Sequence, residues 1–423
     1  MARQIDYKGA QDYLNSLKNK GVKYGIDSIR SITAILQHPE KKFPSVHIAG
    51  TNGKGSTCAM LEAIYRANGY RTGLYTSPYL IHESEMIQVG RRPLSEIDII
   101  LYIKKLKPIA AEIGAKNPDG HPSFFELMTI MAFLHFAESK IDLAILETGI
   151  GGQLDATNVV DPELSIITSI GLDHTDLLGD TIEQIAYQKA GIIKPGKPVL
   201  IGKIPEAAES IIRKYAEERN SKPYSVRERF TDIETLPETN LAGSFQRWNA
   251  AVATYATEIL DKKFPVDSAK TPSILQTIKW PGRWQTIKLA DKTIIFDTTH
   301  NQEGAEMLKQ NLEDLIQKNQ SRPIIIFGTT SELRARSLMP IVPQYARKLY
   351  LVTPKQPDAT SSQTLEKHLP DEIRVPTSQA KIETLFPTPE KCIAGEPGDT
   401  IIITGSIYLV GEVLKRLNIN LSS

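Results

Sequence analysis

The segment that most constrains the fold lies near the N-terminus, where an apolar run leads through a glycine-rich turn into a helical pattern. It reads His47-Ile48-Ala49-Gly50-Thr51-Asn52-Gly53-Lys54-Gly55-Ser56-Thr57. Glycines let a backbone wrap closely around phosphate oxygens, free N–H groups at a helix start point toward them, and Lys54 adds a mobile positive charge. The strict phosphate-loop pattern places Ser or Thr directly after Gly-Lys, whereas Gly55 intervenes here. The segment predicts a strand, a phosphate-binding turn and a helix, and an ordinary turn with a chance lysine is the weaker interpretation.

Short β-prone runs alternate with helical patterns along the rest of the chain. We expect strands at 45–49, 73–76, 142–147, 164–169, 198–201, 293–297, 323–328, 349–352 and 400–404. The helical patterns cover 54–67, 124–138, 181–193, 205–219, 243–260, 303–318 and 407–417. This alternation predicts the α/β class, with parallel sheets covered by helices on both faces. A linker at 261–285 separates a first domain, 1–285, from a smaller second domain, 286–423.

The composition favours a soluble enzyme over several other classes. In 423 residues, 50 Lys and Arg balance 49 Asp and Glu, so the formal charge of +1 offers no electrostatic case for binding nucleic acid. Two cysteines, Cys58 and Cys392, are too few for a disulfide framework, which fits a reducing compartment. No segment offers about 18 continuous apolar residues, so we expect no membrane span and a cytoplasmic location.

A second polar cluster follows the predicted strand at 142–147. It reads Glu147-Thr148-Gly149-Ile150-Gly151-Gly152-Gln153-Leu154-Asp155-Ala156-Thr157-Asn158. A carboxylate at a strand end before a glycine loop suits a metal-bound nucleotide, because Mg²⁺ prefers carboxylate and phosphate oxygens. A dinucleotide-binding fingerprint fails, since Leu154 stands where a third glycine is required. A simple tight turn remains the alternative.

Two further clusters also follow predicted strands. The first contains Asp173 and His174, and Lys189 lies on the helix after it. Without further context, Asp173 and His174 would be a hydrogen-bonded structural pair, and Lys189 a solvated surface lysine. Their position after a strand of the same sheet as Glu147 favours a site instead. The second runs from Asp297 through His300 and Asn301, and could orient a second substrate, although such residues are also common in turns.

Together these segments resemble the folylpolyglutamate synthase/dihydrofolate synthase family, part of the wider Mur-type ATP-dependent amide ligases. The matching segments, in the family's order, are Gly50–Ser56, Thr76-Ser77-Pro78, Glu147–Asn158, Leu172-Asp173-His174, Lys189–Lys194, Trp280–Arg283, Asp297–Asn301 and Thr404-Gly405-Ser406. They cover nearly the whole chain.

The resemblance implies a fold, a reaction and a set of small-molecule partners. The fold is a phosphate-loop ATPase domain of the Mur ligase central type, followed by a smaller Rossmann-like α/β domain. The reaction joins L-glutamate to dihydropteroate or to the γ-carboxylate of a folate: ATP phosphorylates the carboxylate, and the glutamate amine attacks the acyl phosphate. Phosphoryl transfer of this kind needs mainly positioning and charge neutralisation. We expect a monomer that uses ATP and two Mg²⁺ ions.

The resemblance also assigns roles to individual residues. ATP contacts fall on Gly50, Thr51, Asn52, Gly53, Lys54, Gly55, Ser56, Thr57, Gln246, Asn249, Arg283 and Asp297. Metal ligands are Ser77, Glu147 and His174, and substrate contacts are Tyr79, Asp155, His300 and Ser406. The catalytic residues are Lys54, Lys189, Asp297 and His300, and Lys189 matches a lysine that the family carbamylates.

Departures from the family pattern keep two alternatives open. Tyr79 stands where a histidine is common, Thr298-Thr299 replaces Gly-Ala, and Glu332-Leu333-Arg334 replaces Asp-Lys-Asp. These changes lie on the pterin and glutamate sides and leave the ATP and metal residues intact. A Mur-type ligase for another carboxylate, or a nucleotide-binding paralogue without ligase activity, would also account for them.

Overall fold

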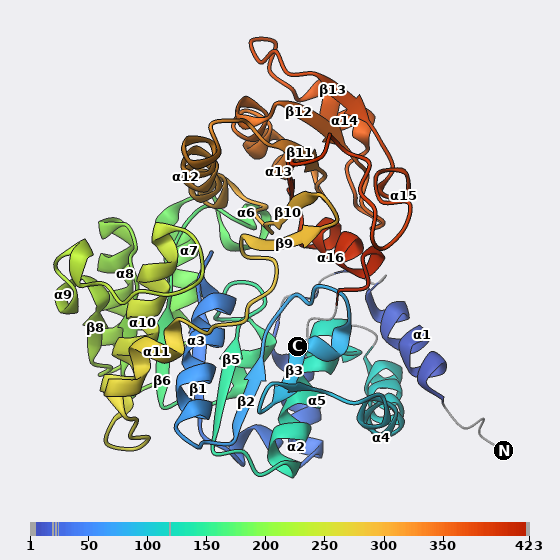
Figure 1. The fold of residues 1–423 in the computed structure, drawn as a ribbon. Helices are drawn as coiled ribbons and strands as arrows, with labels where there is room; N and C mark the ends of the chain where they lie inside the picture. Colours follow the sequence, from blue (N-terminus) through green and yellow to red (C-terminus); the bar gives the residue numbers. More distant parts are fainter. Residues whose placement is uncertain (1–5, 19–20, 22, 24, 118–119, 420–423) are drawn as a thin grey trace. The chain divides into compact units, whose positions relative to one another are not determined.

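The computed structural model describes residues 6–18, 21, 23, 25–117 and 120–419, and they form two compact units. The first unit comprises residues 1–239 and 247–278, and the second comprises 240–246 and 279–423. Each unit is built on its own sheet (Figure 1). The division between the compact units falls between residues 278 and 279, a few residues before the predicted domain boundary at 285/286, which stays a prediction.

The described residues of the first unit form an eight-stranded sheet in the order β4-β3-β2-β5-β1-β6-β7-β8. Its strands are β1 (Ser45–Ala49), β2 (Thr72–Tyr75), β3 (Ile87–Val89), β4 (Arg92–Pro93), β5 (Leu143–Glu147), β6 (Leu164–Ile167), β7 (Val199–Ile201) and β8 (Pro223–Ser225). The central strands β1 and β5 are buried along their whole length, as parallel strands covered on both faces must be. The antiparallel edge, β3 and β4, was not predicted, because strands this short leave little periodicity in a sequence.

Helices cover both faces of this sheet. They are α1 (Tyr7–Lys18), α2 (Asp27–Ile35), α3 (Lys54–Ala67), α4 (Glu96–Lys116), α5 (Phe124–Glu138), α6 (Thr175–Leu178), α7 (Ile182–Ala190), α8 (Glu206–Glu217), α9 (Val226–Arg229), α10 (Ser244–Leu260) and α11 (Thr271–Leu275). One apolar core lies under α1, α2, α4 and α5, and another under α7 and α8. In Figure 1, α4 lies toward the β3 edge, and α8 and α9 lie toward β8.

Local sequence explains where two of these helices begin. Ser123 caps α5 by accepting a hydrogen bond from the Glu126 N–H, and the Glu126 side chain accepts one from the Ser123 N–H. Thr181 and Gln184 form the same reciprocal pair at α7. Each pair satisfies N–H groups that a helix start leaves unbonded. Thr181 is therefore the N-cap of the helix that carries Lys189.

Most of the predicted linker belongs to the first unit. Phe264 packs edge-on against the rings of Tyr65 and Tyr70, and α11 packs on α3. The prediction of a linker from 261 was wrong, because its Lys, Pro, Asp and Ser residues are a polar surface over a packed segment. Only residues 279–284 lie between the end of the first unit and β9, the first strand of the second unit.

The described residues of the second unit form a six-stranded sheet in the order β13-β12-β11-β14-β10-β9. Its elements are β9 (Gln285–Leu289), β10 (Lys292–Phe296), α12 (Gln302–Asn319), β11 (Ile324–Phe327), α13 (Glu332–Leu338), β12 (Lys348–Leu351), α14 (Ser362–Lys367), β13 (Thr377–Gln379), α15 (Ile382–Leu385), β14 (Thr400–Thr404) and α16 (Ile407–Arg416). Four successive pairings from β13 to β10 are parallel, and β9 closes the edge as an antiparallel hairpin with β10. The chain therefore has the two-domain α/β fold expected from the sequence.

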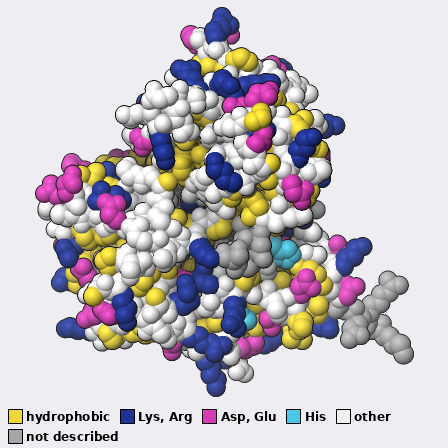
Figure 2. Space-filling model, viewed as in Figure 1, with side chains coloured by type: hydrophobic (Ala, Val, Ile, Leu, Met, Phe, Trp, Pro, Cys, Tyr) yellow, Lys and Arg dark blue, Asp and Glu magenta, His cyan; other side chains and the backbone are white. Residues whose placement is uncertain are grey.

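On the face that Figure 2 draws, acidic and basic side chains are interspersed. Among the helices of the described residues, none is long and apolar enough to cross a membrane. Cys58 and Cys392 are both buried free thiols.

Candidate active site

The carboxyl ends of adjacent strands bring several predicted residues of the first unit to one edge of the sheet. In the pairing of β1 with β5, Ile48 lies opposite Glu147, and in that of β1 with β6, Ala49 lies opposite Ile167. Because parallel strands end at the same edge, the phosphate loop lies beside Glu147 and beside the segment after β6. Ligand sites in open α/β sheets form at such an edge.

The phosphate loop leads from β1 into α3 with the backbone that its glycines permit. Gly53 is the N-cap of α3 and has φ +81°, in the left-handed region. A Cβ atom there would lie 2.4 Å from Oδ1 of Asn249, so the Asn249 side chain would have to move to admit one. The loop therefore presents bare backbone and a helix start, which fits a phosphate group. It also places Asn249, predicted to contact ATP, next to the loop.

Side chains after β6 hold this loop in place. The Thr51 hydroxyl donates to the Gly171 carbonyl oxygen (3.1 Å) and accepts from the Gly171 N–H (3.0 Å). The Thr168 hydroxyl donates to the Asn52 carbonyl oxygen (2.7 Å), and the Ser169 hydroxyl accepts from the Asn52 N–H (2.9 Å). The loop is thus fastened to a neighbouring strand end rather than left to its own flexibility.

Two lysines converge on the backbone at the start of the loop. Nζ of Lys54 donates to the carbonyl oxygens of Gly50 (2.9 Å) and Thr51 (3.2 Å). Nζ of Lys189, which is buried, reaches the same Gly50 oxygen at 2.8 Å from α7. Lys189 is therefore not a surface lysine, and its ammonium group lies against the backbone of the phosphate loop.

The predicted metal ligands come from three strand ends. The Ser77 N–H donates to Oε2 of buried Glu147 (3.2 Å), so these two residues lie in contact. His174 has φ +50°, and its Nε2 lies 3.9 Å from Oδ1 of Asp173. Among the described residues, no three His, Cys, Asp or Glu side chains form a metal-binding group. A carboxylate at a strand end is a ligand type that Mg²⁺ prefers, and the roles of Ser77, Glu147 and His174 in metal binding stay predictions.

Asp155, predicted to contact substrate, is engaged with the glycine loop. Its Oδ2 accepts from the N–H groups of Gly149 (2.8 Å) and Ile150 (3.0 Å), and its Oδ1 from that of Thr157 (3.0 Å). Burial raises the pKa of this carboxyl above its ordinary value, while these hydrogen bonds oppose the rise. The carboxyl group thus orders the loop that follows Glu147.

Tyr79 lies in a small aromatic group with α1. Nζ of Lys18 donates to the Tyr79 hydroxyl oxygen (2.8 Å) and lies 4.7 Å from the centre of the Phe124 ring. Burial and the nearby carboxylates of Glu83 and Glu85 raise the pKa of Tyr79 to about 12. The hydroxyl is therefore neutral at physiological pH.

The predicted residues of the second unit also share one sheet edge. Asp297 follows β10, is buried, and accepts the Thr299 N–H on Oδ1 (3.0 Å). His300 Nδ1 lies 2.9 Å from the Thr298 carbonyl oxygen, so Nδ1 carries the proton in this contact. Ser406 caps α16 by accepting the Tyr408 N–H (3.2 Å). Since the Asp297 N–H donates to Ile403 of β14 (3.0 Å), these strand ends are adjacent.

The remaining predicted nucleotide residues both group with the second unit. Gln246 is fully buried at the start of α10 and groups with the second unit, as does Arg283, which is partly exposed just before β9. Their contacts with ATP stay predictions.

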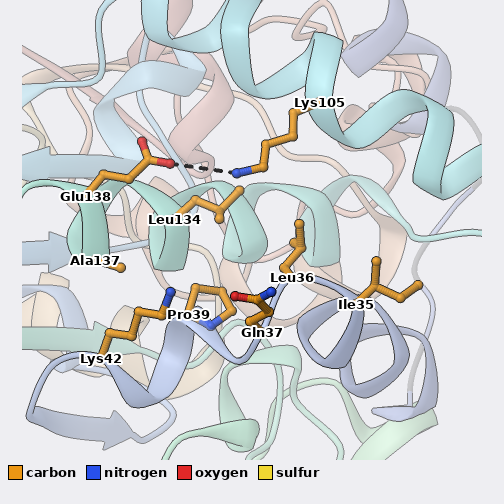
Figure 3. A pocket seen from close by; sticks show the side chains of 9 residues that line it. All are labelled: Ile35, Leu36, Gln37, Pro39, Lys42, Lys105, Leu134, Ala137 and Glu138. Atoms are coloured by element: carbon orange, nitrogen blue, oxygen red, sulfur yellow. Dashed lines mark ion pairs between the residues drawn. The ribbon is translucent and has the colours of Figure 1, made fainter.

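A separate cavity of about 360 Å³ lies away from this edge of the first unit (Figure 3). It is lined by Ile35, Leu36, Gln37, Pro39, Lys42, Lys105, Leu134, Ala137 and Glu138. Lys42 precedes β1 and Glu138 precedes β5. The cavity therefore lies near the amino ends of the two strands whose carboxyl ends carry the phosphate loop and Glu147. Lys105 and Glu138 pair across it at 3.8 Å.

Sequence reasoning missed the residues that hold the site together. Thr168 and Ser169 were assigned to a strand, although their hydroxyl groups fasten the phosphate loop. Lys194 stands out in the sequence only as the end of a motif, yet its Nζ donates to the carbonyl oxygen of Asn158 (2.8 Å). Threonines after a strand and next to a glycine loop are a signal that could have been used.

Comparison with known proteins agrees with this architecture. The model of the Mur ligase middle domain matches residues 48–257, and that of the Mur ligase glutamate ligase domain matches residues 282–407. The fold and the phosphate-loop edge are those of an ATP-dependent ligase of the Mur type. The dihydrofolate synthase/folylpolyglutamate synthase of Bacillus subtilis is 34% identical over 439 residues, which cover 97% of this chain and 99% of that protein. The chain belongs to the folylpolyglutamate synthase/dihydrofolate synthase family.

Solved structures of relatives share the fold over nearly the full length. Escherichia coli FolC in complex with DHPP and ADP is 27% identical, with a TM-score of 0.82 over 97% of each chain. A bifunctional folylpolyglutamate synthase/dihydrofolate synthase with Mn, AMPPNP and L-glutamate bound is also 27% identical. It has a TM-score of 0.81 and covers 99% of this chain and 100% of that one.

Proposed function

We propose that the chain uses ATP to ligate L-glutamate to dihydropteroate, to the γ-carboxylate of a (tetrahydro)folate, or to both. The observation that carries the proposal is the meeting of the phosphate loop, Lys189 and the Ser77–Glu147 pair at one sheet edge. A loop that cradles phosphate beside an acidic group suits transfer of the γ-phosphoryl group. Relatives that hold DHPP with ADP, or L-glutamate with Mn and AMPPNP, support the substrate classes.

The residues of the first unit would bind the nucleotide and the metal. Backbone N–H groups between Gly50 and Thr57 would hold the phosphates, and Lys54 would turn from its carbonyl contacts to the β/γ end. Ser77 and Glu147 would hold one Mg²⁺ and His174 a second, and these ions would supply charge neutralisation for the phosphates. Histidine is an uncommon magnesium ligand. The assignment of His174 as a ligand therefore depends on the family resemblance more than on the chemistry of the ion.

The reaction has two steps. A substrate carboxylate oxygen attacks the γ-phosphorus, and the bond to the leaving ADP oxygen breaks. The amine of L-glutamate then attacks the acyl carbon, phosphate leaves, and a base takes the amine proton. Asp297, His300 and Ser406 would hold glutamate or the transferring phosphate, and His300 is the candidate base.

Lys189 would act beside the phosphate loop, close to the metal residues. A carbamate on its Nζ would convert a cation into an anion that helps to place the metal and the acyl phosphate. Tyr79 and Asp155 would border the pterin, with the Asp155 carboxyl also ordering its loop. We further propose that the enzyme acts as a cytoplasmic monomer.

An assay of ADP release tests the proposal. With millimolar Mg²⁺ and L-glutamate, we expect release that depends on dihydropteroate, on tetrahydrofolate, or on both, with products identified by mass. Release stimulated by a different carboxylate alone would indicate another Mur-type specificity. ATP binding without turnover on any of these carboxylates would indicate a paralogue without ligase activity.

A further inference from the structure

Asn158 and Lys194 form a contact in the first unit that the proposed mechanism does not use. Asn158 lies in the 3₁₀ turn Ala156–Val159 after the glycine loop, and Lys194 follows α7. Nζ of Lys194 donates to the backbone oxygen of Asn158 (2.8 Å) and to its Oδ1 (2.9 Å). An ammonium group has no acceptor, so Oδ1 must face it and the amide nitrogen must face the other way.

That amide nitrogen joins the glycine loop to the end of α7. Nδ2 of Asn158 donates to the carbonyl oxygens of Gln153 in the loop (3.0 Å) and Gly191 at the helix end (3.1 Å). The Gln153 N–H also donates to the Gln188 carbonyl oxygen (2.8 Å). One amide orientation therefore fixes two segments that are more than 30 residues apart in the chain.

Close packing between the two segments leaves no room for them to slide. A Cβ atom on Gly152 would lie 2.8 Å from the Lys189 carbonyl oxygen, and one on Gly191 would lie 2.4 Å from Cβ of Gln153. The loop and the helix end must therefore move together. The side chain of Lys189, on the last turn of this helix, reaches the Gly50 carbonyl oxygen at 2.8 Å.

We infer that Lys194 is a positioning residue for Lys189, which it holds against the phosphate loop by fixing the Asn158 amide at the end of α7. The inference rests on the proposed role of Lys189 in the reaction. Lys194 itself touches neither the phosphate loop nor Glu147 in any contact described above. Its effect is carried through Asn158 and the backbone of α7.

Three substitutions and a matched control test this inference by steady-state kinetics. Lys194→Met keeps the aliphatic stem but removes the donor, and Asn158→Asp keeps an acceptor for Lys194 but removes both amide donors. We expect each to lower kcat at least about tenfold with the KM for ATP within about twofold, since a misplacement of 1 Å can cost roughly a hundredfold. Lys194→Arg should restore most of kcat. The control is Lys197→Met, three residues after Lys194, which loses an ion pair with Glu163 and should behave as wild type.

Competitive acetylation of the folded protein, read by mass spectrometry, gives a second readout that needs no turnover. We expect Lys189 to react at least about fivefold faster in Lys194→Met and Asn158→Asp than in wild type, because its helix end is released. Circular dichroism melting confirms that each variant is folded, and Asn158→Asp decides alone if Lys194→Met does not fold.

Wild-type kcat and wild-type Lys189 reactivity in both variants would overturn the inference, as would a loss confined to the KM for ATP. If wild type releases no ADP with any pterin, the proposed function fails. The acetylation comparison then still decides whether Lys194 positions Lys189.

Discussion

At the scale of single residues, Lys54 has the most direct predicted effect. Its ammonium group donates to the Gly50 and Thr51 carbonyl oxygens, and its side chain is only partly buried. Lys54→Ala should lower ADP formation by roughly a hundredfold or more, the usual cost of losing a charge-stabilising group, with an unchanged melting curve. The exposed Lys42→Ala, before β1, is the control. Activity retained in Lys54→Ala would contradict the phosphate-loop assignment.

His47 makes a second prediction, about stability and pH. It is fully buried on β1 with Nε2 2.7 Å from the Thr157 hydroxyl, and burial together with nearby Lys194 lowers its pKa to about 3. Between pH 6.5 and 3 the unfolded chain therefore binds a proton that the folded chain does not. The free energy of unfolding falls as pH drops through this range, by up to about 1.4 kcal/mol per pH unit from this group.

Urea unfolding at pH 7 and pH 5 measures the effect of His47. His47→Gln cannot titrate, so we expect its unfolding free energy to fall less than that of wild type between the two pH values. Equal losses in the two proteins would show that His47 takes up its proton without unfolding, against the pKa given above.

At the scale of elements, hydrophobic periodicity and the positions of glycines predicted the central strand and helices of the first unit well. The strand at 45–49 and the helices at 54–67 and 124–138 have the bounds that the sequence predicted, because local patterns and caps alone determine them. The strand at 164–169 ends at Ile167, since the next two side chains turn toward the phosphate loop. Contacts of that kind join distant parts of the chain, and no local pattern records them.

The contact between the glycine loop and α7 leaves little space for an added side chain. An alanine at 152 would place its Cβ 2.8 Å from the Lys189 carbonyl oxygen, a backbone atom that cannot turn aside. Gly152→Ala should cost about 1–3 kcal/mol of unfolding free energy and lower kcat, because α7 must shift. Gly25→Ala, where a Cβ meets nothing within 4 Å, should stay within about 0.5 kcal/mol. Urea unfolding compares the two, and equal costs would contradict a close contact at Gly152.

At the scale of the whole molecule, the sequence predicted which residues meet at the sheet edge but not the contacts that hold them there. Glu147 and the phosphate loop could be placed at one edge because they end neighbouring parallel strands. The burial of Lys189 and its contact with Gly50 could not be predicted from the sequence, since they depend on how α7 crosses the sheet. The predicted linker failed for a related reason: polar composition does not show that Phe264 packs on α3.

Ligand binding to the whole chain gives the last prediction. A non-hydrolysable ATP analogue that binds only the folded protein should add about 2.7 kcal/mol of stability at a hundredfold excess over its Kd. Because Glu147 and Ser77 provide few protein ligands for a metal, the phosphates and Mg²⁺ should bind together. Chelation by EDTA should therefore remove most of the thermal shift, and Lys54→Ala should reduce it with Mg²⁺ present. An equal shift with and without Mg²⁺ would mean that the analogue binds away from the Ser77–Glu147 pair.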